Sequence, residues 1–134
     1  MPDLSDLISR VEKASGGDRE LDEAIALTLN IYVRERRGKD RQYWFYKVGG
    51  NDYERRSTHR YAGSDGLPFY TSSLDAVLTL LPDNSIADVA TTGVAWVDVT
   101  GDPCLHSAKC ATAPLALLSA ILRARQAMQV EVQS

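Results

Sequence analysis

The sequence has no long hydrophobic run and only two cysteines, and each shortage excludes a class of protein. The longest apolar stretches, 76–81 and 113–118, are far shorter than the roughly 20 residues of a membrane span. The acidic first residues lack the apolar segment of a secretory signal. Two cysteines in such a chain are typical of free thiols rather than of a disulfide framework. We therefore expect a cytoplasmic protein without a membrane partner.

Recognisable catalytic motifs are also missing. The chain has two histidines, no G-x-S-x-G and no glycine-rich nucleotide fingerprint, so hydrolase, dinucleotide and P-loop chemistry are not indicated. Cys104, His106 and Cys110 form the one cluster of soft metal ligands, to which His59 adds a fourth candidate. Their spacing lacks the C-x-x-C of a zinc knuckle. We predict no catalytic residue, no metal site and no cofactor; metal binding by this cluster is the alternative left open.

What the chain does have is the composition of one globular domain. Its 134 residues are 44% hydrophobic and 25% charged, which is enough apolar material for a core. No linker, repeat or low-complexity segment divides it, so we expect a single domain over residues 1–134.

The hydrophobic pattern predicts an α+β fold in the order α-α-β-β-α-β-β-α. Apolar residues at helical spacing predict helices over 4–11, 18–29, 72–81 and 112–128, with Asp18, Ser72 and Thr112 as N-caps. Alternating or β-branched segments predict strands over 31–36, 41–48, 86–91 and 94–100. Residues 53–68 and 102–111 have neither pattern and are expected to be loops. Hairpin connections favour one antiparallel sheet of about four strands, covered by helices.

Three blocks of the sequence, which cover about half the chain, stand out: the opening helices, with Asp6-Leu7-Ile8 and Arg19–Ala26; the segment Tyr70–Val77 followed by Leu80-Leu81-Pro82; and the last helix, Ala113–Leu118 through Leu122–Arg125. Together these blocks resemble the phage ABA sandwich domain family. The resemblance implies a phage or prophage origin, hence a host-cell cytoplasmic location, and an α/β/α sandwich, but it supplies no activity and no site residue. Each block also has an ordinary structural interpretation as a cap or a core stripe.

The strongest functional feature is a basic and aromatic segment. Residues 34–60 contain nine of the fifteen Lys and Arg residues but only four acids, a net charge of +5, whereas the remainder carries −8. Guanidinium groups suit phosphates and aromatic rings stack on bases, so this segment is a candidate anion-binding site. A solvated hairpin with intrachain ion pairs is the alternative. The candidate ligand-binding residues are Arg34, Arg36, Tyr53, Arg55, Arg56, Arg60 and Tyr61.

These observations favour a non-enzymatic phage accessory protein that binds and sequesters a small anionic ligand, such as a nucleotide signal of host anti-phage defence. The first alternative is a protein-binding or structural module that forms a homo-oligomer. The second is weak single-stranded nucleic-acid binding, which the acidic overall charge makes the least favoured. We also expect a homo-oligomer, because a small chain rich in strand aromatics tends to leave an apolar face uncovered.

Overall fold

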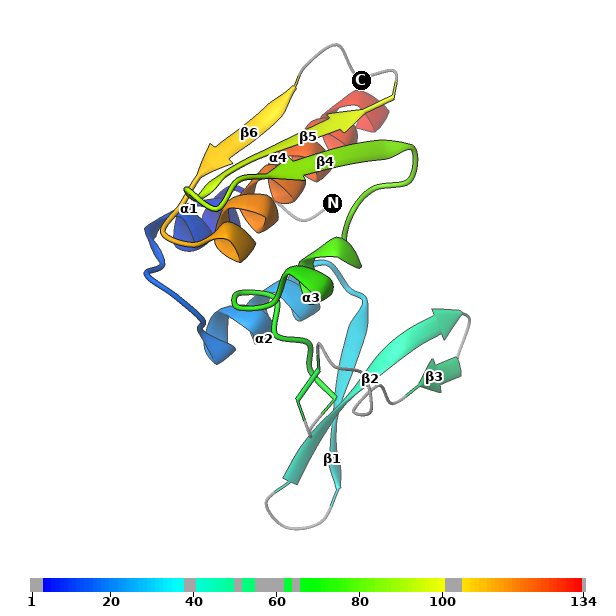
Figure 1. Ribbon diagram of the computed structural model, residues 1–134. Coiled ribbons are helices and arrows are strands. Elements are labelled where there is room, and N and C mark those ends of the chain that lie inside the picture. Colours follow the sequence, from blue (N-terminus) through cyan, green and yellow to red (C-terminus); the bar gives the residue numbers. More distant parts are fainter. Residues whose placement is uncertain are drawn as a thin grey trace.

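The computed structural model describes residues 4–37, 41–49, 52–54, 62–63, 66–100 and 105–133, and on β1–β3 it describes the side chains of residues 32 and 43–45. Within this part of the chain the predicted α+β class is confirmed (Figure 1). The elements are α1 (Ser5–Lys13), α2 (Arg19–Thr28), β1 (Tyr32–Arg37), β2 (Arg41–Gly49), β3 (Asp52–Glu54), α3 (Leu74–Leu78), β4 (Ser85–Val89), β5 (Val94–Val99), β6 (His106–Lys109) and α4 (Ala113–Gln133).

The strands form two antiparallel sheets, in the orders β1-β2-β3 and β4-β5-β6. The prediction of a single sheet of about four strands is therefore wrong. The two additional strands, β3 and β6, lie in segments that we predicted as loops. In β6 the sequence His-Ser-Ala-Lys contains no β-branched or aromatic residue, so its local preference for a strand is weak. Pairing with β5 and packing on α4 supply what the local sequence lacks.

Local capping fixes where the central helices begin. The Asp18 side chain accepts hydrogen bonds from the amides of Glu20 (3.0 Å) and Leu21 (3.3 Å), which confirms it as the N-cap of α2. Such a cap stabilises a helix by about 1 kcal/mol. In α3 the cap is Ser73 rather than the predicted Ser72, and the helix is shorter than its apolar stripe indicates.

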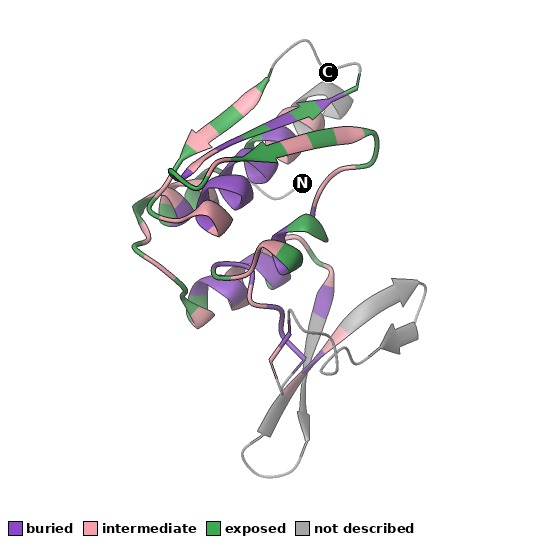
Figure 2. Cartoon of the chain, viewed as in Figure 1, coloured by how far each residue is buried: buried purple, intermediate pink, exposed green. Residues whose placement is uncertain are grey.

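The core is built around α4. Every residue from Leu115 to Leu122 is buried, so this helix has an apolar contact on each of its faces. Ala95 and Val97 of β5 face α4, whereas α1 packs against α4 through Leu7 and Val11. Figure 1 shows α4 behind the β4-β5-β6 sheet, and Figure 2 shows the buried residues concentrated in this helix and on α2. One face of this sheet is thus covered by a helical layer.

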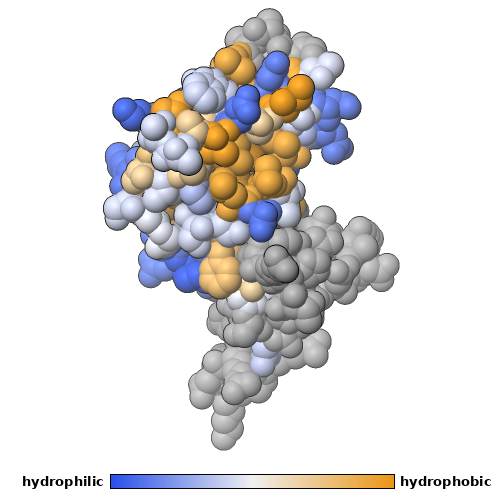
Figure 3. Space-filling model, viewed as in Figure 1, coloured by the Kyte–Doolittle hydropathy of each residue, from blue (hydrophilic) through white to orange (hydrophobic). Residues whose placement is uncertain are grey.

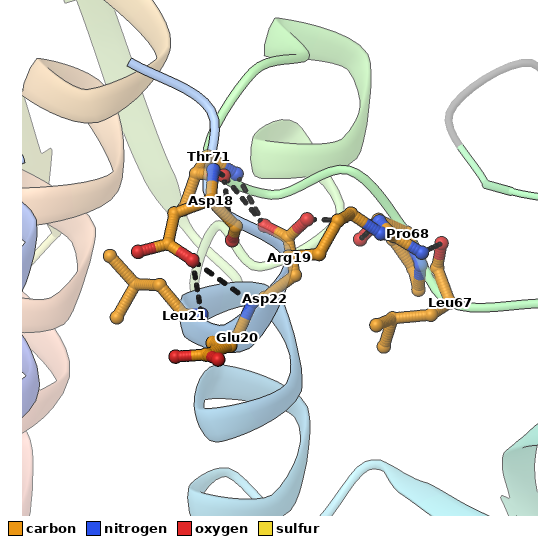
Figure 4. A network of polar contacts seen from close by, with 8 residues as sticks. All are labelled: Asp18, Arg19, Glu20, Leu21, Asp22, Leu67, Pro68 and Thr71. Carbon is orange, nitrogen blue, oxygen red and sulfur yellow. Dashed lines mark hydrogen bonds and ion pairs between the residues drawn. The ribbon is translucent and has the colours of Figure 1, made fainter. Parts of the chain in front are cut away.

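A buried polar network fastens α2 to the segment that leads into α3 (Figure 4). Asp22 accepts hydrogen bonds from the Thr71 amide (2.8 Å) and hydroxyl (2.9 Å). It is also paired with Arg19 at 2.9 Å. Arg19 in turn donates to the carbonyl oxygens of Leu67 and Pro68, each at 3.1 Å. Burial raises the pKa of Asp22, and the bonds from Thr71 and the charge of Arg19 offset this only in part.

A second polar contact joins the turn after α3 to α4. The Arg125 guanidinium donates to the carbonyl oxygen of Leu80 from Nε (2.9 Å) and Nη2 (2.7 Å), and its burial lowers the pKa of Arg125. With the Asp22–Thr71 network, this contact joins the three sequence blocks that carry the family resemblance. Each block therefore has a structural role in holding the helices together.

Candidate functional site

An open cleft of about 670 Å³ separates β6 from α1, with α4 at its base. From α1 it is lined by Ser5, Ile8, Ser9 and Glu12, whose spacing places them on one helical face. This mostly polar face lies beside the apolar stripe through which α1 packs against α4. The cleft therefore runs along about two turns of α1.

The other walls come from residues on β6 and α4. Leu105 and His106 line the wall on the side of β6, and Gln126 lines the wall formed by α4. At one end of the cleft the Leu4 amide donates to Oε1 of Gln126 at 2.9 Å. At the other end Glu12 contacts the first half of α4, so α1 and α4 are antiparallel. In Figure 1, β6 runs toward the end of the molecule where α4 begins, so β6 is antiparallel to α4 and runs in the same direction as α1.

Glu12 and Arg123 are paired at the far end of the cleft. Glu12 Oε1 accepts hydrogen bonds from Arg123 Nε and Ser119 Oγ, both at 2.9 Å, and also from Arg123 Nη2. Burial on its own would raise the pKa of Glu12, but the hydrogen bonds from Arg123 and Ser119 and the Arg123 charge outweigh it, so this pKa lies below its ordinary value. Among the described residues that line the cleft, these two formal charges cancel at pH 7.

The soft-ligand cluster is only partly described. Cys104 and His59 lie outside the described residues, whereas His106 lines the cleft and Cys110 follows β6. Burial raises the pKa of the Cys110 thiol, and the negative charge of Glu12 raises it further. A protonated thiol is a weak nucleophile and a weak metal ligand. Within the described ranges, no three His, Cys, Asp or Glu side chains lie close enough together to hold a metal ion.

Most of the predicted anion-binding residues lie outside the described part of the chain. Arg55, Arg56, Arg60 and Tyr61 are not described, and for Arg34, Arg36 and Tyr53 the structure gives the backbone position alone. Arg34 and Arg36 belong to β1, and Tyr53 belongs to β3. The described part of the chain therefore does not test this predicted site.

The register of β1 and β2 pairs Tyr32 with Tyr46 and Arg34 with Trp44. Among the side chains that the structure describes on these strands, Tyr32 and Trp44 are buried.

The outer face of the β4-β5-β6 sheet, which points away from α4, exposes several apolar side chains. Ile86 is 73% exposed, Leu105 59% and Trp96 37%, and they surround a shallow cavity of about 360 Å³ with Asp88 and Asp98. Figure 3 shows hydrophobic residues gathered on the side of the molecule that this sheet presents. Leu105 borders both this cavity and the cleft, so the two features are continuous across the edge of β6.

The cleft cannot be predicted from the sequence, because its residues are far apart in the chain and form no motif. The polar spacing of Ser5, Ser9 and Glu12 was present in the sequence, but such a stripe is typical of any solvated helix face. No helix in the described part of the chain is long and apolar enough to cross a membrane. Comparison of the chain with protein-family models, curated proteins and solved structures finds no match.

Proposed function

We propose that this protein is a non-enzymatic binding protein, and that the cleft between α1, β6 and α4 holds a segment of a partner protein. The observation that carries this proposal is the lining of the cleft. It combines hydroxyl, amide and imidazole groups with apolar side chains, and its carboxylate and its guanidinium are already paired with each other. Protein segments are polar along the backbone and carry no fixed charge there, so such a lining suits them.

The same pairing argues against other uses of this cleft. A phosphate group at Arg123 would have to compete with Glu12, which already accepts two of its hydrogen bonds. Glu12 is also a poor general base, because a lowered pKa makes its carboxylate reluctant to take a proton. Protein binding was an alternative in the sequence analysis, and the described geometry supports it best.

A cleft-filling substitution tests this proposal. Ser9 is half-buried on the α1 wall, so in the Ser9→Trp variant the indole should occupy the space of the ligand. We expect a displayed library of random heptapeptides to yield enriched binders on the wild type and none on Ser9→Trp. Leu27→Trp, at an exposed position on α2, is the matched control and should retain the binders. Equal enrichment on all three proteins, or no enrichment on any, would contradict the proposal.

A second candidate function rests on the charge of residues 34–60. A local charge of +5 in a chain of net charge −3 supports the sequestration of a small anionic ligand, such as a nucleotide signal of host defence, through Arg34, Arg36, Arg55, Arg56 and Arg60. Tyr53 and Tyr61 would stack on a base. Calorimetry with a panel of cyclic and linear nucleotides tests this function, and the absence of binding heat for every member would reject it.

The biological setting belongs to the same proposal. The family resemblance supports an origin in a phage or prophage and a place in the host-cell cytoplasm. It also supports an α/β/α sandwich, which would require a further layer on the outer face of the β4-β5-β6 sheet. The exposed Ile86 and Trp96 on that face support homo-oligomer formation.

A further inference from the structure

The cleft lies along an edge of the β4-β5-β6 sheet, where no strand of the described residues pairs with β6. β6 pairs with β5 on one side, and it is the last strand of the β4-β5-β6 sheet. An edge strand presents backbone donors and acceptors to whatever lies beside it. Ser107 and Leu105 of this edge line the cleft, so the hydrogen-bonding groups of the edge face the cleft space.

The register identifies which residues present these groups. In an antiparallel pair, the backbone groups of alternate residues point to the partner strand and those of the intervening residues point away. The Cys110 amide donates to the Gly93 carbonyl at 2.9 Å, which continues the β5–β6 ladder. Counting back in steps of two, Ala108 and His106 face β5. The backbone groups of Leu105, Ser107 and Lys109 consequently point away from β5, and of these three residues Leu105 and Ser107 line the cleft.

The helical layer extends beyond the three strands. α4 packs against all three strands, whereas α1 packs against α4 and stands across the cleft from β6. In Figure 1 both helices lie behind the plane of the sheet. The residues that line the strand side of the cleft, 105–107, extend over about 7 Å, and α1 from Ser5 to Glu12 extends over about 10 Å. The two walls leave room for about three extended residues.

From these observations we propose that the partner segment binds as an added strand, paired with the edge of β6 that points away from β5 and lying over α1. This inference rests on the proposed function of the cleft and specifies its partner, an extended peptide segment that makes the sheet four-stranded. Backbone hydrogen bonds to Leu105 and Ser107 supply the binding, as in other cases of strand addition to a sheet edge. The neutral lining fits this role, because an added strand brings backbone dipoles rather than a charge.

The two faces of the sheet determine which kind of side chain fits at each position of the bound segment. Residues paired with Leu105 and Ser107 point to the outer face, where they extend the apolar row that contains Trp96. The intervening residue points inward, toward Ser9 and the Glu12–Arg123 pair. The occupant is therefore a segment with apolar residues at every second position and small polar residues between them. A whole second copy of the sheet is a poorer fit, because α1 stands where its helices would lie.

The test removes one backbone donor. Ser107→Pro deletes an amide that faces the cleft and leaves the ladder to β5 intact, and proline is tolerated on edge strands. Ser107→Ala is the matched control, since it deletes the hydroxyl and keeps the amide. With a heptapeptide enriched on the wild type, we expect fluorescence anisotropy to show at least tenfold weaker binding to Ser107→Pro and less than threefold change for Ser107→Ala.

A second measurement keeps the inference falsifiable if the proline variant is unstable. The amides of an extended peptide point alternately to its two sides, and only one set would face β6. N-methylation of that set should abolish binding, whereas N-methylation of the other set should leave binding unchanged. If Ser9→Trp abolishes peptide binding but neither Ser107→Pro nor N-methylation changes the affinity, strand addition is wrong and the proposed function stands. If light scattering shows a wild-type dimer that Ser107→Pro converts to a monomer, the occupant is a second copy and the inference is overturned.

Discussion

Replacement of Asp22 by alanine should lower the free energy of unfolding by about 3 kcal/mol, because it leaves a buried backbone amide without an acceptor. Asp22 is 1% exposed and accepts hydrogen bonds from both the amide and the hydroxyl of Thr71. The change also removes the carboxylate partner of Arg19. Urea unfolding followed by circular dichroism measures the effect.

The control variant for this prediction is Asp22→Asn, which keeps one oxygen as an acceptor for Thr71 and loses the charge. Because burial raises the pKa of Asp22, the charge itself is costly in the folded protein, and we expect Asp22→Asn to lose less than half as much stability as Asp22→Ala. The raised pKa also means that protonation favours the folded state. The deficit of Asp22→Asn should therefore grow as the pH falls from that raised pKa toward 3.8. Equal losses in both variants would show that the hydrogen bonds to Thr71 contribute little.

Gly93→Ala should be comparably damaging, with a loss of about 3 kcal/mol. Gly93 has a φ of +87°, which costs a residue with a Cβ about 1–2 kcal/mol. The added Cβ would also lie 2.4 Å from the carbonyl oxygen of Cys110, a backbone atom that can move only by displacing the end of β6. Differential scanning calorimetry should show a clear fall in the melting temperature.

Gly16→Ala is the matched control for this backbone effect. A Cβ at Gly16 meets nothing within 4 Å, and its φ is not in the left-handed region. Its melting temperature should be unchanged or slightly higher, since alanine restricts the unfolded chain more than glycine does. A Gly93→Ala variant as stable as Gly16→Ala would mean that β6 is not held at the position described.

Local rules predicted the helices and four of the six strands. Asp18 and Thr112 have the side-chain oxygens that cap a helix, and both accept the hydrogen bonds expected of them. The strand β5 was evident from its run of Val, Ala and Trp, which need no distant partner to indicate a strand.

The remaining features depend on contacts between distant segments. β6 is a strand because β5 and α4 hold it, and its own four residues contain no indication of this. The cleft requires Glu12 to meet Ser119 and Arg123, which are 107 and 111 residues away in the chain. No sequence motif spans such a distance. Sequence patterns instead favour the basic segment, because its charge can be recognised without knowing the fold.

Amide hydrogen exchange at β6 should reveal whether a bound peptide pairs with this strand. In the free protein the Ser107 amide should exchange quickly, because it faces the cleft, whereas the Ala108 amide faces β5 and should be protected. On addition of an enriched heptapeptide, two-dimensional NMR should show exchange at Ser107 slowed by at least tenfold, with little change at the exposed Leu27 on α2. A bound peptide that leaves the Ser107 amide exchanging as fast as in the free protein would contradict the account.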